Sequence, residues 1–248
     1  HARWTDYMTI SGVKVFSDLE KGINADGIDI DGCRNVTISD CIVETGDDAI
    51  VLKTTNLHGE SRSCENVTVN NCVLQSSSTA LKLGTESHAD FRYISFNNCV
   101  IRNSNRGLSI VIRDGGTAEN IQFSNIMVEC SRRHFNWWGN ADPIWLVVLK
   151  RRPDSSVGSI RNITFNNIIA HGMGTSKIEG FEGKPLENIR MNNVQFFMHP
   201  ENYIDKRADD AFRAVNVNDL WLTDVSVKWD TTSVEPLWRN AFTFEKVN

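Results

Sequence analysis

One short phrase recurs eight times along the chain, and this repetition limits the folds that the chain can adopt. Each copy places alternating apolar residues on both sides of a polar pair, which usually contains Asn or Ser. Equivalent positions in successive copies are 28, 31, 27, 27, 42, 26 and 31 residues apart. The copies occupy residues 8–15, 36–43, 67–74, 94–101, 121–128, 163–170, 189–196 and 220–227.

Each copy predicts a strand, a turn and a second strand. The alternation indicates that one face of each strand is buried, and the polar pair favours the turn. No leucine-rich frame is present, and a propeller blade needs about 40 residues and four strands. Units of this length that cannot bury a face alone stack into a solenoid. We therefore predict an all-β fold, a right-handed parallel β-helix with one coil per repeat, as a single domain over residues 1–248.

The repeat frame also assigns five of the six cysteines and the asparagines to columns. Stacked thiols that face inward are typical of small buried apolar residues, although neighbouring coils are close enough for a disulfide. The recurring Asn pairs predict a stacked hydrogen-bonding ladder, and the Asn-X-Thr sequons fall in the same frames. One cysteine column holds Cys33 and Cys64, a second holds Cys41, Cys72 and Cys99, and the sequons begin at Asn35, Asn66 and Asn162.

The net charge of −5 and the pI near 5.7 argue against a nucleic-acid-binding protein, which normally shows a basic stripe. No apolar run approaches the roughly 20 residues that span a bilayer, so no membrane partner is expected. The chain begins at His1 within a strand-like phrase. We interpret it as processed, trimmed or a fragment.

The segment 24–50 combines strand-like alternation with clustered acidic residues. Asp26, Asp47 and Asp48 stand beside Gly27 or Gly46 at the ends of strand-like runs. Clustered carboxylates raise the pKa of one member while its neighbours stay charged, which suits acid–base chemistry. The alternative is that the Asp pair is a solvated turn after Gly46.

Residues 46–54, 77–85 and 105–113 are predicted to form one strand in three successive coils. Glu86 and Arg113 then share a column with Thr55, which predicts a Glu86–Arg113 ion pair. The outer face becomes a mixed-charge groove suited to an extended, charged polymer. The residues predicted to face inward are Ile50, Leu52, Leu81, Leu83, Leu108 and Ile110, and those predicted to face outward are Val51, Lys53, Lys82, Gly84, Ser109 and Val111.

Two motifs carry a resemblance to a known family. "NADG" at 24–27 and "GDDAI" at 46–50, with 21 residues between Asp26 and Asp47, resemble motifs of family 28 of the glycoside hydrolases, the polygalacturonase family. The resemblance implies a parallel β-helix and hydrolysis of pectin with inversion, with Asp47 as general acid and Asp26 and Asp48 activating water. It further implies a secreted or periplasmic enzyme without metal or other cofactor. "LKLGTESHADF" and "RGLSIVIRDGG" resemble a bacterial branch of the family.

The chain departs from the family at two motifs that hold substrate carboxylates. Residues 78–80 read Ser-Thr-Ala where the family has GHG, and residues 109–111 read Ser-Ile-Val where it has RIK. Other side chains are therefore expected to bind the substrate. His58 and His88 could take part in catalysis, or they could simply be exposed histidines in loops. Arg113 could hold the substrate, or it could form an ion pair with Glu86 or Asp114. The candidates near the acids are Asn24, Lys53, Lys82, Glu86, His88 and Arg113.

The 42-residue interval holds an insertion that is expected to project as a loop. Trp137 and Trp138 in this insertion are candidates for stacking on sugar rings, since an indole offers a broad apolar face. The alternative is that one caps the core and the other packs on a coil. The charged segment 203–214 is predicted to be a further exposed loop.

Two other functions fit the sequence. One is a glycan-binding β-helix without catalysis, since a fold alone does not fix a function. The other is a calcium-dependent polysaccharide lyase, which would use acidic residues for calcium and a Lys or Arg as base. Because members of the resembled family are longer, N-terminal coils are expected to be missing. An uncovered solenoid end would then favour self-association.

Overall fold

The computed structural model describes residues 1–133, 139–233 and 235–248, and every regular element in these residues is a β-strand. No helix that could cross a membrane occurs in the described part of the chain. The strands are β1 (Ala2–Arg3), β2 (Asp6–Ser11), β3 (Lys14–Phe16), β4 (Ile28–Asp31), β5 (Arg34–Ser39), β6 (Ile42–Thr45), β7 (Ile50–Thr54), β8 (Cys64–Asn70), β9 (Val73–Ser76), β10 (Thr79–Ser87), β11 (Phe91–Asn97), β12 (Val100–Ser104), β13 (Arg106–Ile112), β14 (Thr117–Cys130), β15 (Asp142–Val148), β16 (Ser159–Gly172), β17 (Ser176–Glu179), β18 (Leu186–Met198), β19 (Asp210–Trp229) and β20 (Asn240–Val247).

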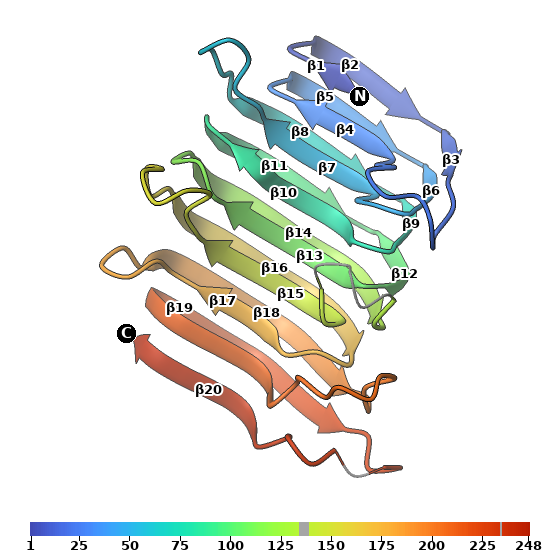
Figure 1. Ribbon diagram of the computed structural model, residues 1–248, viewed down its shortest axis with the longest axis vertical. Coiled ribbons are helices and arrows are strands. Elements are labelled where there is room, and N and C mark those ends of the chain that lie inside the picture. Colours follow the sequence, from blue (N-terminus) through green and yellow to red (C-terminus); the bar gives the residue numbers. More distant parts are fainter. Residues whose placement is uncertain (134–138, 234) are drawn as a thin grey trace.

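These strands form three parallel sheets that run along a solenoid, with the two termini at opposite ends (Figure 1). The first sheet contains β1, β4, β7, β10, β13, β15, β17, the start of β19, and β20. The second begins with β2, β5, β8 and β11, and the third with β3, β6, β9 and β12. From β14 onward, single long strands contribute to both of these sheets. The predicted right-handed parallel β-helix is confirmed.

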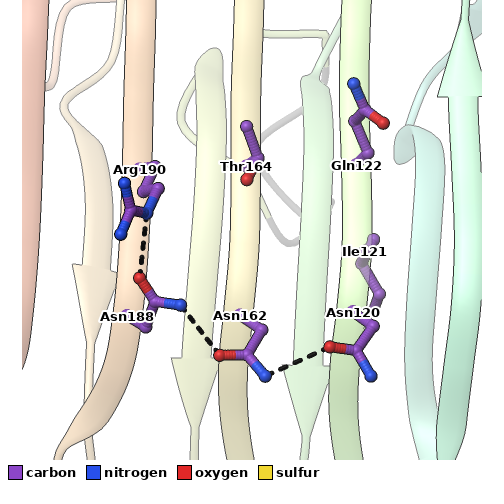
Figure 2. Close-up of a pocket in the computed structure, with 7 residues that line it drawn as sticks. All are labelled: Asn120, Ile121, Gln122, Asn162, Thr164, Asn188 and Arg190. Carbon is purple, nitrogen blue, oxygen red and sulfur yellow. Dashed lines mark hydrogen bonds between the residues drawn. The ribbon is translucent and has the colours of Figure 1, made fainter.

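Asparagines turn the chain at the start of the second sheet. Asn120, Asn162 and Asn188 have φ angles of 56°, 55° and 51°, a left-handed conformation that Asn tolerates better than most residues. Their side chains form a ladder, with Nδ2 of Asn188 donating to Asn162 at 2.9 Å and Nδ2 of Asn162 donating to Asn120 at 3.1 Å (Figure 2). The ladder predicted for the Asn pairs is confirmed in a second column, where Nδ2 of Asn193 donates to Asn167 and Nδ2 of Asn167 donates to Asn125, both at 3.0 Å. Of the sequons, Asn162 lies in the column of Figure 2, and Asn66 donates to Asn35 at 3.0 Å nearer the N-terminus.

All six cysteines are buried free thiols. The backbone N–H groups of Val73 and Val100 donate to the carbonyl oxygens of Cys41 and Cys72 at 3.0 and 2.9 Å, which places the second predicted column on successive coils. The structural interpretation of the cysteines is confirmed.

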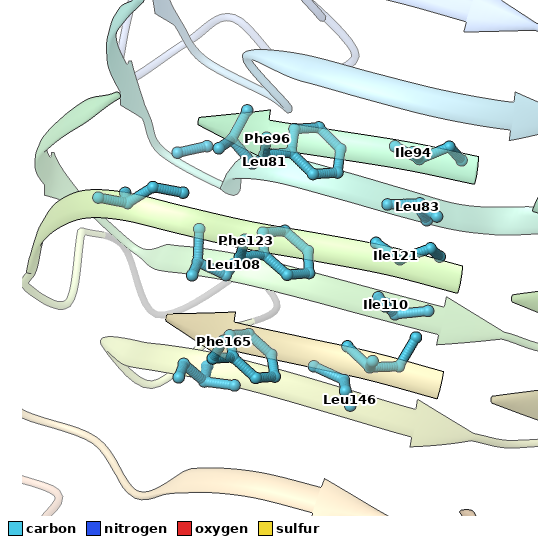
Figure 3. Packing of buried hydrophobic residues seen from close by; sticks show 14 of the residues in the cluster. Leu81, Leu83, Ile94, Phe96, Leu108, Ile110, Ile121, Phe123, Leu146 and Phe165 are labelled. Carbon is cyan, nitrogen blue, oxygen red and sulfur yellow. The ribbon is translucent and has the colours of Figure 1, made fainter. Parts of the chain in front are cut away.

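The core is built from side chains that stack coil upon coil. Leu81 pairs in register with Ile50 and with Leu108, so the predicted inward positions share one column. Behind them the rings of Phe96, Phe123 and Phe165 are stacked, with centroids 4.9 and 5.1 Å apart (Figure 3). Each coil therefore buries its apolar face against the coil before and the coil after it.

The predicted outer column is wrong beyond Leu83. Leu83 pairs with Leu52, but the next pair joins Ser87 to Thr54, so three residues of β10 stand where β7 has one. The bulge removes Glu86 from the Arg113 column, and its carboxylate lies 3.6 Å from the guanidinium of Arg151 instead. The predicted Glu86–Arg113 ion pair is therefore wrong.

The outer face is also less open than predicted. Val51 and Ser109 are fully buried although they point away from the core cluster, and Val111 is nearly so. Gly84 cannot carry a side chain in the bulge, since a Cβ there would lie 2.1 Å from the carbonyl oxygen of Val111. The open part of this face is confined to cavities on either side of Ser109.

We expect Phe123→Ala to lower the free energy of unfolding by about 3–5 kcal/mol, because it opens a gap in the middle of the ring stack. Phe16→Ala is the matched control, since Phe16 is 63% exposed and its replacement should cost under about 1 kcal/mol. Urea unfolding followed by circular dichroism measures both. Equal losses would contradict a core held by the ring stack.

Candidate functional site

Three aspartates meet where two turns stack at the edge of the first sheet. Asp26 lies in the turn before β4, and Asp47 and Asp48 lie in the turn before β7. Backbone bonds join the turns: the N–H of Gly27 donates to the carbonyl of Asp48 at 2.9 Å, and the N–H of Asp47 donates to Ala25 at 3.3 Å. A carboxylate oxygen of each aspartate lies within 4.8 Å of one from each of the others. The structure thus brings together the three aspartates that the sequence singled out.

The aspartates line an open cavity of about 590 Å³, which we call the aspartate cavity. Four of the predicted substrate-binding residues, Asn24, Lys53, Lys82 and Glu86, also line it, which places most of the predicted site in one hollow. Its lining residues are Ile23, Asn24, Asp26, Asp29, Asp47, Asp48, Lys53, Ser78, Lys82, Thr85 and Glu86.

Two lysines hold two of the aspartates. The ammonium of Lys53 donates to Asp26 at 2.6 Å and to Asp29 at 2.7 Å. The ammonium of Lys82 donates to Asp48 at 2.6 Å. Asp47 accepts a backbone bond from Asp48 at 2.9 Å, and the described residues place no lysine or arginine within ion-pair distance of it. The carboxylates therefore differ in their neighbours.

Hydrogen bonds from the next coil fix Asp48 further. Its Oδ1 accepts from the hydroxyl of Ser78 at 2.9 Å and from the backbone N–H of Thr79 at 3.1 Å. With Lys82 on its other oxygen, Asp48 accepts hydrogen bonds from three donors, which fix the position of its carboxylate. Ser78, which stands where the family has its histidine motif, thus positions Asp48 through a hydrogen bond.

The cavity holds more negative than positive charge. Its lining carries the carboxylates of Asp26, Asp29, Asp47, Asp48 and Glu86 and the ammonium groups of Lys53 and Lys82. Burial raises the pKa of Asp26 to about 6 against the opposing pull of Lys53. Burial and then the charge of Asp48 raise the pKa of Asp47. Burial disfavours the charged form of Lys53, but its bonds to Asp26 and Asp29 outweigh this and raise its pKa. The cluster is thus arranged to hold a proton in mildly acidic solution.

The remaining predicted residues lie elsewhere. His88 faces Asp114, with Nε2 3.8 Å from Oδ2, and neither His88 nor Arg113 lines the aspartate cavity. His58 is exposed in a tight turn between Leu57 and Glu60, which agrees with the alternative interpretation. Trp137 and Trp138 lie outside the described residues.

The sequence analysis did not identify Asp29 and Arg151 as residues of the site. Asp29 pairs in register with Val51, which pairs with Lys82, so extending the strand frame back by one coil would have found it. Arg151 donates to Asp114 at 2.7 Å and to the carbonyl oxygen of Thr85 at 2.8 Å, and so supports one rim of the aspartate cavity. It comes from a distant loop, and no sequence pattern links it to the site.

The three aspartates are also the residues that could hold a divalent cation. A cation there would compete with Lys53 and Lys82, whose ammonium groups already lie 2.6 Å from oxygens of Asp26 and Asp48. The raised pKa values of Asp26 and Asp47, beside the lysine-paired Asp48, suit proton transfer to and from a bound substrate better.

Comparison with known proteins assigns the family. Residues 3–206 match the sequence profile of the glycosyl hydrolases family 28. The chain belongs to this family. A stretch of 60 residues in this family 28 chain is 42% identical to a probable polygalacturonase from Arabidopsis thaliana, over 23% of this chain and 13% of that protein.

Solved structures confirm the fold of the family 28 chain. A hyperthermoactive exopolygalacturonase from Thermotoga maritima superposes with a TM-score of 0.66 at 19% identity, covering 97% of this chain and 47% of that one. A family 28 exopolygalacturonase from Yersinia enterocolitica gives 0.56 at 18% identity, covering 90% and 39%. The chain spans less than half the length of these relatives. The resemblance to a bacterial branch remains a prediction.

We expect Asp26→Asn to stabilise the protein at pH 7 by on the order of 1–2 kcal/mol. Because the folded pKa of Asp26 is raised to about 6, the folded state binds the extra proton and the parent loses stability as pH rises from about 4 to 6. The variant should lack this loss, so its advantage should vanish near pH 4.

Thermal and urea unfolding from pH 4 to pH 7 measure this difference. Asp224→Asn is the matched control, since it removes the same charge from an exposed turn where other coils carry Asn. Equal pH profiles for the parent and Asp26→Asn would contradict the raised pKa.

Proposed function

We propose that this chain is the catalytic part of a glycoside hydrolase that cleaves glycosidic bonds in pectic polysaccharide, of the galacturonate- or rhamnogalacturonan-containing kind. The observation that carries the proposal is the aspartate cavity, in which three carboxylates converge in a chain of family 28. The polygalacturonase names of its relatives support the choice of substrate class. Since pectic polysaccharide lies outside cells, the enzyme would act as a secreted or periplasmic protein.

The neighbours of each carboxylate support a division of roles. Asp47 has no ammonium partner among the described residues and has a raised pKa, as a general acid requires. It would donate its proton to the glycosidic oxygen as the bond to the anomeric carbon breaks. Asp26 and Asp48, which accept hydrogen bonds from Lys53 and Lys82, would in their carboxylate form accept a proton from the water that attacks that carbon.

Inversion is the expected stereochemical course. Typical inverting pairs leave roughly 6.5–9.5 Å between carboxyl groups to admit a water molecule. The closest oxygens of this cluster lie within 4.8 Å, which is tighter than that range. With three carboxylates, however, one pair can hold the water while Asp47 faces the leaving group. The anomer of the product decides between inversion and retention.

The lyase alternative is less compatible with the site. A lyase needs a neutral Lys or Arg to remove a proton from the sugar. The Lys53 ammonium is bonded to two carboxylates and its pKa is raised, which makes it a poor base. A binding protein without catalysis would have no use for the raised pKa of Asp47.

We expect Asp47→Asn to lower the rate of glycan cleavage by at least about 100-fold, because the amide cannot donate the proton. Digestion of a panel of pectic substrates, followed by chromatography and anomer-resolved NMR, measures the rate and the product. Asp224→Asn should cleave like the parent.

Three results would contradict parts of this proposal. Retained anomers would contradict inversion. An unsaturated, ultraviolet-absorbing product that requires added calcium would identify a lyase. Substrate binding without cleavage by the parent would identify a glycan-binding protein.

A further inference from the structure

The aspartate cavity lacks a cation that is free to bind a substrate carboxylate. Lys53 and Lys82 are the lysines that line it, and both are bonded to aspartates at 2.6–2.7 Å. A uronate carboxylate in this cavity would therefore find no lysine that is not already paired. If the substrate is a uronate-containing polymer, as the proposed function holds, its carboxylates need another binding position.

A second cavity of about 220 Å³ lies on the same outer face, further toward the C-terminal end of the solenoid. Lys82, Ser109, Trp145 and Lys177 occupy one position on the successive strands β10, β13, β15 and β17. At roughly 4.8 Å between strands, Lys177 lies about 14 Å along the axis from Lys82. The cavity is lined in part by Arg106, Asn140, Asp142, Trp145, Lys177 and Arg207.

The indole of Trp145 is held in place at this second cavity. The guanidinium of Arg106 lies 3.5 Å from the centre of its ring. Arg106 is itself buried and fixed by Asp142, whose Oδ2 accepts from its Nε at 3.1 Å and from its Nη2 at 2.8 Å. A partly exposed, immobilised indole offers a sugar ring an apolar surface at low entropic cost.

Lys177 supplies the free cation. Its ammonium makes no hydrogen bond within the described part of the chain, and the one carboxylate within ion-pair distance there is that of Glu179, at 4.0 Å. Arg207 on the other side is occupied, since it donates to Asp205 at 2.8 Å and to Asn140 at 2.9 Å. Lys177 is therefore able to pair with a ligand anion without breaking an existing bond.

We propose that the second cavity binds a carboxylate-bearing sugar residue of the same glycan chain whose scissile bond lies at Asp47. Trp145 contacts the sugar ring and Lys177 pairs with its carboxylate. Between the two cavities Ser109 is fully buried, so the glycan would pass over the side chains that cover it. The site requires a free acid at a position several sugars away from the bond that is cleaved, and so selects de-esterified stretches of an acidic polymer. This inference rests on the proposed function for the bond cleaved, but its binding step is tested without catalysis.

The test measures binding in the Asp47→Asn background, so that the glycan stays intact. Calorimetry with oligogalacturonides of two to six sugars, unesterified and fully methyl-esterified, gives affinity as a function of length and charge. We expect Lys177→Gln to weaken binding of the longer unesterified oligomers by about three- to tenfold, with a smaller effect as they shorten. Lys177→Arg should restore most of the affinity.

Lys14→Gln is the matched control, since it removes one exposed ammonium from β3 in the third sheet and should leave every affinity unchanged. The proposal would be overturned if Lys177→Gln weakened binding of esterified and unesterified oligomers equally. It would also be overturned if the loss of affinity did not increase with oligomer length. Binding of two oligomers per protein, one of them lost in Lys177→Gln, would show an independent site and overturn the single-chain arrangement. Lys177-dependent binding in a parent that cleaves nothing would support this site while refuting the hydrolase.

Discussion

The parallel hydrogen bonding of each coil to the next is the interaction on which every other feature depends. It fixes a spacing of roughly 4.8 Å between residues that are 22 to 42 positions apart in the chain. In the core this spacing stacks like upon like, as in the phenylalanine column. At the sheet edge the same spacing sets the turn of Asp26 against that of Asp47. The stacking of the coils thus brings the acidic residues together, and no long loop is needed to position them.

The electrostatics of the site follow from that placement. Five carboxylates brought into one hollow repel one another, and two lysines on neighbouring strands reduce the repulsion without cancelling it. Backbone hydrogen bonds between the two turns keep these negatively charged side chains close together. Such stored unfavourable energy is common where proteins carry out proton transfer. The excess negative charge also limits which sugars are accepted next to the acids.

Much of the fold was predictable because the repeat is regular. Alternation and turn residues fixed the strands, the thiol columns and the Asn ladder, since each depends only on neighbours in the frame. The aspartates were found for the same reason. The Glu86–Arg113 pair failed because a bulge at Gly84 shifts one strand locally, which an average period does not reveal. Arg151 and Lys177 were not found, because their roles depend on which charges other residues have already taken.

The Asn ladder has a direction. Each amide nitrogen donates toward the N-terminal coil, and each amide oxygen accepts from the coil that follows (Figure 2). Each coil that contributes an Asn to the ladder therefore presents the same donor on one side and the same acceptor on the other. Removing or inserting a whole coil rejoins complementary groups, whereas replacing one Asn leaves a donor and an acceptor unmatched. Inserting or deleting an entire repeat therefore disturbs the ladder less than replacing a single Asn does. This gives such solenoids a route to change length during evolution.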